Sequence, residues 1–255
     1  PRQLLLAGLD DALLLISNAY RFLRFTPRQL LDLQAARLTV QHQVPFGKRE
    51  QLCHVAAWGR ERLHERLLLA TTLGVVRPYP LPILRDNLET PVPLKFDHPL
   101  PGDVLAALGS NGGETLLLLT AGGRGLRLAV DDLRLGGLQA VNCGADDRVA
   151  AALLGQAADE ALLVTADGYG RRLRLDGAPA AERPNSKGGS LIARRSPLVG
   201  AAWGNGRGVW LATTTRLLPL DPAQAPLADS TRTERLVKLE AGEVGVCLVA
   251  ADKSG

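Results

Sequence analysis

The chain has 255 residues, of which 46% are hydrophobic and only 4% aromatic, so it can bury a sizeable core that must be mainly aliphatic. No apolar run reaches the roughly 18 residues that span a bilayer, so we expect no transmembrane helix and no membrane partner. The net charge is +4, with arginine far more common than lysine. Arginine suits phosphate well, although such a composition can also reflect genome base composition.

The N-terminus does not look like a signal peptide, because only four apolar residues (4–7) precede Gly8. Three cysteines, Cys53, Cys143 and Cys247, lie far apart in the sequence. An odd, scattered set argues against a disulfide framework and fits a reducing compartment. We therefore expect a cytoplasmic protein.

Five segments of the chain repeat one pattern. Each has an apolar strand rich in small residues, a polar link, an aliphatic strand that ends in serine or threonine, a turn, and a basic residue. The anchoring hydroxyl residues are Ser17, Thr71, Thr120, Thr165 and Thr213, with successive gaps of 54, 49, 45 and 48 residues. This period suits a four-stranded propeller blade. A sixth copy begins as V-G-V-C-L-V-A-A at Val244 and is cut short.

The strand pattern predicts an all-β fold, a β-propeller or β-pinwheel of five to six four-stranded blades. The continuous aliphatic runs indicate strands buried on both faces, and the small-residue strands should lie near the ring axis. Asp167-Gly168 is a hairpin signal. Alternation in Leu126-Arg127-Leu128 predicts leucine inward and arginine outward. A further strand, such as 92–96, precedes each new copy, and no helix is expected between copies.

The repeats divide the chain without leaving a linker. We therefore predict one domain over residues 1–255, and the predicted repeats cover approximately 1–50, 51–102, 103–147, 148–197, 198–242 and a partial 243–255.

The fourth repeat carries a family resemblance. Its V-T-A-D-G-Y-G-R-R segment (Val164–Arg172) resembles the signature hairpin in the C-terminal domain of DNA gyrase A, and the topoisomerase IV equivalent is similar. The segment S-K-G-G-S-L (Ser186–Leu191) resembles the glycine-basic loop that follows in that family. The second and third repeats match more loosely. The resemblance covers the whole chain as a repeat, but only the fourth copy matches closely.

The resemblance implies a non-catalytic domain whose rim binds and bends duplex DNA beside a topoisomerase core. The ATPase, the cleavage tyrosine and its metal would then belong to other domains or subunits, and no cofactor is expected here. The basic box Q-R-R-G-G-K-G of gyrase is not found, and the nearest string is Arg183–Gly189. The third repeat is acidic, so the basic arc is interrupted. A weaker, topoisomerase IV-like contact, or a degenerate paralogue, is therefore the alternative to full wrapping.

We expect the phosphate contacts to be basic residues at strand ends of the blade edges. The strongest candidates cluster in one repeat, and are Arg171, Arg172, Arg174, Lys187, Arg194 and Arg195. The others lie at comparable positions of earlier repeats, and are Arg21, Arg24, Arg77, Arg124 and Arg127. The competing interpretation is a solvated blade edge, where charge guards against edge pairing.

No pattern points to catalysis or metal binding. The G-G-R-G segment at 122–125 precedes no helix, so it is read as turn chemistry. The four histidines lack metal-ligand spacing with cysteines or acids. Two other interpretations stay open: a protein-interaction propeller without nucleic-acid binding, and a propeller with a ligand or active site in its central channel.

Overall fold

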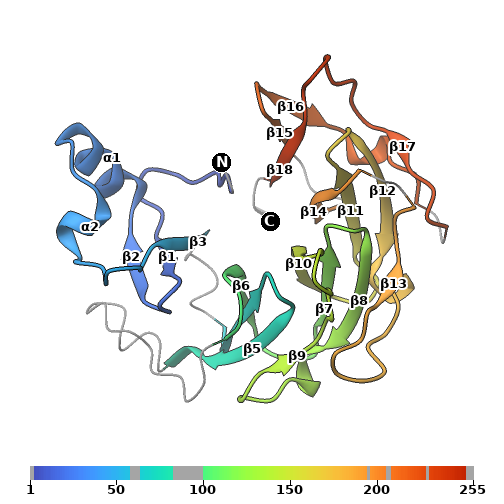
Figure 1. The fold of residues 1–255 in the computed structure, drawn as a ribbon, viewed down its shortest axis with the longest axis horizontal. Coiled ribbons are helices and arrows are strands. Elements are labelled where there is room, and N and C mark those ends of the chain that lie inside the picture. The colour runs from blue at the N-terminus through green and yellow to red at the C-terminus, as the bar shows by residue number, and fades with distance from the viewer. Residues whose placement is uncertain are drawn as a thin grey trace.

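The computed structural model describes residues 3–57, 64–82, 100–193, 196–204, 208–227 and 230–250. They fold into five antiparallel sheets arranged around an axis like the blades of a propeller (Figure 1). Three sheets have four strands, and two have three in this part of the chain. The predicted all-β propeller fold is confirmed, with five blades. No helix in these ranges is long and apolar enough to cross a membrane.

The blades are numbered here by the order of their central strands. Blade 1 contains β1 (Leu13–Ser17), β2 (Phe22–Phe25) and β3 (Leu52–Ala57). Blade 2 contains β4 (Arg66–Thr71), β5 (Val75–Pro80), β6 (Val104–Ser110) and β9 (Leu138–Gln139). Blade 3 contains β7 (Thr115–Thr120), β8 (Arg124–Ala129), β10 (Val149–Gly155) and β13 (Gly189–Ser190). Blade 4 contains β11 (Glu160–Thr165), β12 (Tyr169–Arg174), β14 (Leu198–Trp203) and β17 (Glu234–Arg235). Blade 5 contains β15 (Val209–Thr213), β16 (Leu217–Leu220) and β18 (Gly245–Ala250).

Each complete repeat after the first supplies strands to two neighbouring blades. In chain order β6, β7, β8 and β9 follow one another, yet β6 and β9 join blade 2 while β7 and β8 form the centre of blade 3. The next repeat does the same with β10 and β13 around β11 and β12. In blades 2, 3 and 4 the inner and outer strands therefore come from the repeat that follows the centre. The predicted strand over 92–96 lies outside the described residues.

The segment predicted to begin a sixth copy belongs to blade 5. β18 is the inner strand of blade 5, paired with β15 from Val209 to Thr213. It completes that blade because every small-residue strand closes the preceding hairpin.

The expectation of no helix between repeats was wrong. Two short helices, α1 (Pro27–Ala35) and α2 (Val40–Gln43), follow β2. The Thr26 hydroxyl accepts a hydrogen bond from the Gln29 amide, and the Gln29 side chain accepts one from the Thr26 amide. Pro27 takes the first position of α1. In the third, fourth and fifth repeats the equivalent stretch becomes the outer strand of the preceding blade. The described chain has no blade before blade 1, and the helices cover the apolar face of blade 1 instead, with Leu33 in its core.

The central strand of each blade packs against both neighbours. In blade 3, Leu116 and Leu118 join a core shared with blade 2, while Leu117 and Leu119 join a core shared with blade 4. All four leucines are at most 1% exposed. Burying each such side chain contributes about 1.5–3 kcal/mol, so these short strands hold the disc together. Successive small-residue strands, β3, β6, β10, β14 and β18, contact one another around the axis, as predicted.

Three outer strands dock on the hairpin turns in one way. Each outer strand and the two residues after it are called here the return segment (138–141, 189–192 and 234–237). The carbonyls of Gly74, Gly123 and Gly168 each accept hydrogen bonds from two successive amides of this segment. These glycines have positive φ angles of 82°, 76° and 79°, a conformation that costs glycine least. The predicted hairpin signal at Asp167-Gly168 is thereby confirmed. The bond joins two repeats, because the return segment belongs to the next one.

Side-chain size is matched where the return segment enters. The residue that contacts the return segment is the second residue of the returning hairpin strand, which is Gly125 in blade 3 and Gly170 in blade 4. A Cβ on Gly125 would lie 2.7 Å from Cδ1 of Leu191, and a Cβ on Gly170 would lie 2.6 Å from Cδ1 of Leu236. In blade 2 this residue is Val76, and the incoming residue, Ala140, is small. A large residue on one side therefore goes with a small one on the other.

An N-terminal strap, residues 3–8, joins the first blade to the last. The side-chain amide of Gln3 donates to the carbonyl of Val55 at 2.6 Å and accepts from the Val55 amide at 3.2 Å. Gln3 and Leu5 line the axial cavity together with Cys247 of β18. The strap therefore spans from blade 1 to blade 5, which Figure 1 shows on either side of the N-terminus.

The fit between hairpin and return segment predicts a stability loss for Gly170→Ala. A Cβ at this position would lie 2.6 Å from the Leu163 carbonyl oxygen as well as against Leu236. We expect a loss of about 1–3 kcal/mol in the free energy of unfolding, measured by urea denaturation followed by circular dichroism. Gly136→Ala is the matched control, because a Cβ there meets nothing within 4 Å. Equal losses in the two variants would contradict the packing argument.

Candidate nucleic-acid interface

The serine or threonine that ends each central strand organises the hairpin. All five hydroxyl residues are buried. In four blades the hydroxyl accepts a backbone amide from across the turn, for example that of Arg124 on Thr120 at 3.3 Å. In blade 4 the Thr165 hydroxyl donates to the Tyr169 carbonyl instead, at 3.0 Å. The hydroxyl fixes where the first residue of the returning strand lies.

That first residue defines one equivalent position in every blade, here called the rim position. Register places five residues there: Arg21, Val75, Arg124, Tyr169 and Arg216. Each precedes the residue that pairs with the position before the serine or threonine. Comparing the five shows which blades direct positive charge outward.

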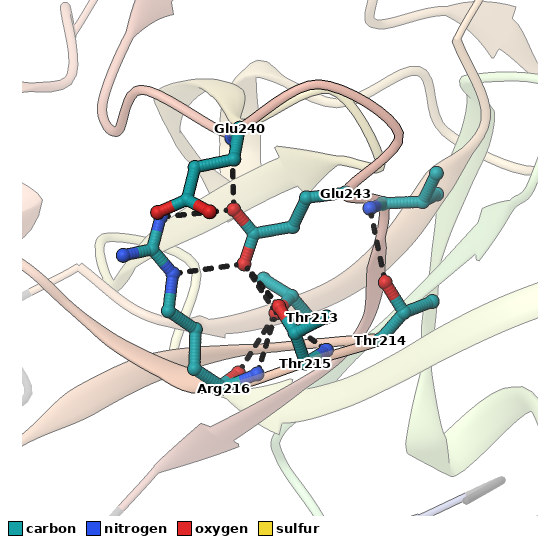
Figure 2. Close-up of polar contacts among 7 residues, drawn as sticks. Thr213, Thr214, Thr215, Arg216, Glu240 and Glu243 are labelled. Carbon is teal, nitrogen blue, oxygen red and sulfur yellow. Dashed lines mark hydrogen bonds and ion pairs between the residues drawn. The ribbon is translucent and has the colours of Figure 1, made fainter.

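In blade 5 the rim arginine is 42% exposed but is paired with a buried carboxylate. Figure 2 shows Arg216 donating from Nε and Nη2 to the two carboxylate oxygens of Glu243, each at 3.0 Å. The Glu243 side chain is only 2% exposed and also accepts from the hydroxyls of Thr213 and Thr215. The hydrogen bond from Arg216 and that from the Glu240 amide hold the Glu243 pKa far below its usual range.

Blade 1 has the same pairing of its rim arginine with a buried carboxylate. Arg21 pairs with Glu50 at 3.2 Å, and both side chains are largely buried. Burial alone would raise the Glu50 pKa, but bonds from the Ser17 hydroxyl, the Gly47 amide and Arg21 outweigh it and leave the pKa lowered. The guanidinium of Arg21 also donates to the Pro45 carbonyl at 2.7 Å. Both end blades therefore neutralise their rim arginine.

Blade 3 presents its rim arginine to solvent. Arg124 is exposed and its guanidinium donates to the backbone carbonyls of Lys187 and Gly188, so no carboxylate neutralises it among these contacts. Lys187 is exposed beside it. The loop that carries Lys187 is anchored on the outer segment of blade 2, because the Asn185 amide donates to the Gln139 carbonyl at 2.6 Å.

Blade 4 presents a cation by another route. Its rim residue, Tyr169, accepts bonds from Nε and Nη2 of Arg235 at 3.2 and 2.9 Å, and the guanidinium lies 5.3 Å from the ring centre. Arg235 comes from the paired outer strand and is exposed. Blade 2 has Val75 at the rim position, 7% exposed. The outward cations at the rim position and its paired strand thus lie on adjacent blades, 3 and 4.

Two predicted contact residues donate hydrogen bonds to backbone carbonyls of the following repeat. Arg127 and Arg172 share one register position, one residue before leucines that are buried as alternation predicted. Nε of Arg127 donates to the Ala178 carbonyl at 3.0 Å, and Nε of Arg172 donates to the Ala225 carbonyl at 3.1 Å. These carbonyls follow the 3-10 turns η3 (Leu175–Gly177) and η4 (Pro222–Gln224), which have a counterpart in η2 (Val130–Asp132). Arg172 also pairs with Glu160 at 2.9 Å.

The remaining predicted residues are placed variously. Arg171 is 3% exposed and donates from Nη1 to the Leu191 carbonyl at 2.8 Å. Arg77 shares its register position and is half-buried. Arg174 is exposed and paired with Asp176, whose pKa it lowers. Arg24 is exposed on β2. The last two residues of the set, Arg194 and Arg195, lie outside the described residues.

A rim hollow of about 660 Å³ adjoins the two basic blades. Its lining includes Arg171 and Arg174 of blade 4 and Ser190 and Leu191 from the outer segment of blade 3. Arg235 was not among the predicted contacts, because it comes 66 residues after Tyr169. The signal available was the spacing of the return segments, since Arg235 precedes two aliphatic residues as Ser190 does.

The axial channel is a cavity of about 560 Å³ lined mainly by aliphatic residues of the five inner strands. His54 is its histidine, and burial lowers its pKa to about 4, so the ring is neutral near pH 7. Across the described ranges no three histidine, cysteine or acidic side chains gather as a metal ion would need.

Neither the models of known protein families nor the curated protein sequences give a match to this chain. Solved structures do. The C-terminal domain of DNA gyrase A superposes with a TM-score of 0.74 at 16% identity, covering 96% of this chain and 84% of that one. The C-terminal domain of E. coli ParC gives 0.60 at 12% identity, covering 94% and 98%. The C-terminal domain of DNA topoisomerase IV gives 0.58 at 16% identity, covering 98% and 80%. The chain has the fold of these domains, and the fold implied by the resemblance is confirmed.

The buried Glu243 predicts acid sensitivity in blade 5. Its folded pKa lies below the ordinary value of 4.5, so the ionised carboxylate stabilises the fold above about pH 4.5, and this contribution is lost as the pH falls further. We expect Glu243→Gln to lower the melting temperature near pH 7, and the gap to narrow near pH 3. Thermal melts at both pH values test this. Glu240→Gln is the control, since that side chain is 74% exposed. An equal loss of melting temperature in this variant would contradict the stabilising role of Glu243.

Proposed function

We propose that this chain is a non-catalytic DNA-binding and DNA-bending domain, related to the C-terminal domains of type IIA topoisomerase A subunits. Its main contact with duplex phosphates is the rim of blades 3 and 4. The fold supports the relationship, because the similar domains belong to gyrase A and topoisomerase IV. The partners would be duplex DNA and a topoisomerase core.

The observation that carries the proposal is the difference among the five rim positions. Arg21 and Arg216 are neutralised by buried carboxylates, and Val75 is apolar. Arg124 with Lys187, and Arg235 beside Tyr169, instead expose cations on neighbouring blades. Cations that touch phosphate release counterions and need not read bases, so this surface suits binding without sequence preference.

The curvature of the disc gives the cations a role in bending. Adjacent blades point in different directions around the axis (Figure 1). A duplex that touches cations on both must follow that change of direction, and neutralising phosphates on one side lowers the cost of the bend. A contact made mainly by two blades bends a short length of DNA and does not need the missing gyrase box.

The Arg124→Ala/Lys187→Ala variant tests the proposal. We expect weaker binding to a duplex of several helical turns, and a plot of log K against log salt that is shallower by about two. The reason is that two phosphate contacts are lost. Fluorescence anisotropy across a salt series measures both quantities.

The matched control is Lys48→Ala/Arg49→Ala, which removes the same two side-chain types. These residues lie between α2 and β3 of blade 1, across the ring from blade 4, and both are exposed. We expect the slope of this variant to stay near that of the parent. Absence of binding by the parent protein at low salt would overturn the proposed function. Equal effects of the two double variants would overturn the assignment to blades 3 and 4.

A further inference from the structure

The edge strand of blade 5 has the pairing position that other blades fill. β16 pairs with β15 on one side, and the described residues place no strand on the other. In blades 2, 3 and 4 the outer strand pairs at two positions only: the rim residue and the one after it. In blade 5 these positions are Arg216 and Leu217, and Leu217 is 56% exposed. Its counterparts Val76, Gly125 and Gly170 are buried.

The three outer segments inside this protein show what such an edge accepts. Each is extended, pairs through two residues, and continues with two aliphatic residues whose amides bond the turn carbonyl. Their sequences are Leu-Gln-Ala-Val (138–141), Gly-Ser-Leu-Ile (189–192) and Glu-Arg-Leu-Val (234–237). The aliphatic pair packs into the core on the side of the next blade.

The size matching described above selects among these sequences. Glycine at the second position accepts leucine, and valine accepts alanine. Blade 5 has Leu217 at this position, so its complement is a small residue, as in Leu-Gln-Ala-Val. Incoming aliphatic groups would lie toward the outer face of blade 5, where Ala212, Cys247 and Val249 form a small core with half-buried Trp210.

We propose that β16 is an acceptor for an extended strand of a partner protein. The residue two positions after the one paired with Leu217 would be alanine or glycine, and the next residue would be aliphatic. The amide and carbonyl of Arg216 are already bonded to Thr213, so main-chain bonds at Leu217 supply the binding, and the size of the Leu217 side chain supplies the selectivity. A second copy of this chain is a poor occupant, because edge-to-edge pairing would bring together copies of Leu217 and of Pro219, which has no amide to donate. The described Gln139-Ala140-Val141 segment is already used by blade 2.

Two synthetic peptides copied from this chain are the probes: Gly-Leu-Gln-Ala-Val-Asn (137–142) and Gly-Gly-Ser-Leu-Ile-Ala (188–193). Each is titrated into isotopically labelled protein, and the amide signals of Leu217 and the indole signal of Trp210 are followed by NMR. We expect the alanine peptide to shift both signals saturably. The leucine peptide should bind roughly tenfold more weakly, because two large groups would overlap.

Leu217→Gly should reverse this preference, since glycine leaves room for leucine as in blades 3 and 4. Leu135→Gly, at another exposed leucine, is the control and should change neither affinity. If Leu217→Gly is poorly folded by circular dichroism, Leu217→Ala takes its place and should narrow the preference. Three results would overturn the proposal: no saturable shift at Leu217, equal affinities for the two peptides in every variant, or concentration-dependent shifts at Leu217 without peptide, which would assign the edge to a second copy.

Discussion

The hydrogen bonds on the glycine carbonyl of each hairpin turn are the constraint on which the disc depends. In blades 2, 3 and 4 this carbonyl accepts two amides from a segment that belongs to the following repeat. The bond therefore sets the blade order as well as the turn. Positive φ at the glycine turns the carbonyl toward that segment, and a Cβ on Gly74 would lie 2.5 Å from the carbonyl oxygen of Val141. Packing of the leucine-rich central strands follows from this exchange.

In blades 1 and 5 a buried carboxylate holds the hairpin turn. Blade 5 in the described chain has no outer strand, and its turn is tied down by Glu243, which gathers Arg216 and two threonine hydroxyls. Blade 1 uses Glu50 and Arg21 in the same way. A buried carboxylate needs such partners, because desolvation without them is costly. The arginines that hold these turns are consequently neutralised, and the unpaired positive charge at the rim position and its paired strand lies on blades whose turns are held by backbone bonds.

Periodicity alone predicted the fold class and much of the hairpin chemistry. Thr120 and Thr165 end buried strands as their spacing predicted, and the turn glycines take positive φ. Strand exchange could not be predicted, because β6 begins 33 residues after β4 ends and no local pattern records that pairing. The helices of the first repeat did have a local signal, the capping sequence of Thr26, Pro27 and Gln29, but the repeated strand pattern favoured an extended segment there.

The charged residues were harder to place than the apolar ones. An arginine on an alternating strand is compatible with contact to phosphate, to a carboxylate or to a carbonyl, and the sequence does not distinguish them. Arg171 and Arg172 read as a basic pair, but one is buried against the Leu191 carbonyl and the other holds Glu160 and Ala225. Arg235 was overlooked because its partner Tyr169 lies in another repeat. Partners distant in sequence decide the role of each guanidinium.

The exchange of strands has a consequence for synthesis of the chain on the ribosome. A hairpin such as β7–β8 emerges before β10 and β13, the strands that flank it, and β13 ends 61 residues after β8. Each blade is therefore left open at both edges until most of the next repeat has been made. The strap settles late in this order, since Gln3 and Leu5 line the axial cavity together with Cys247 of β18, which is made near the end. The protein is thus assembled in sequence from one end, with contacts between distant residues that make such folds slow to complete.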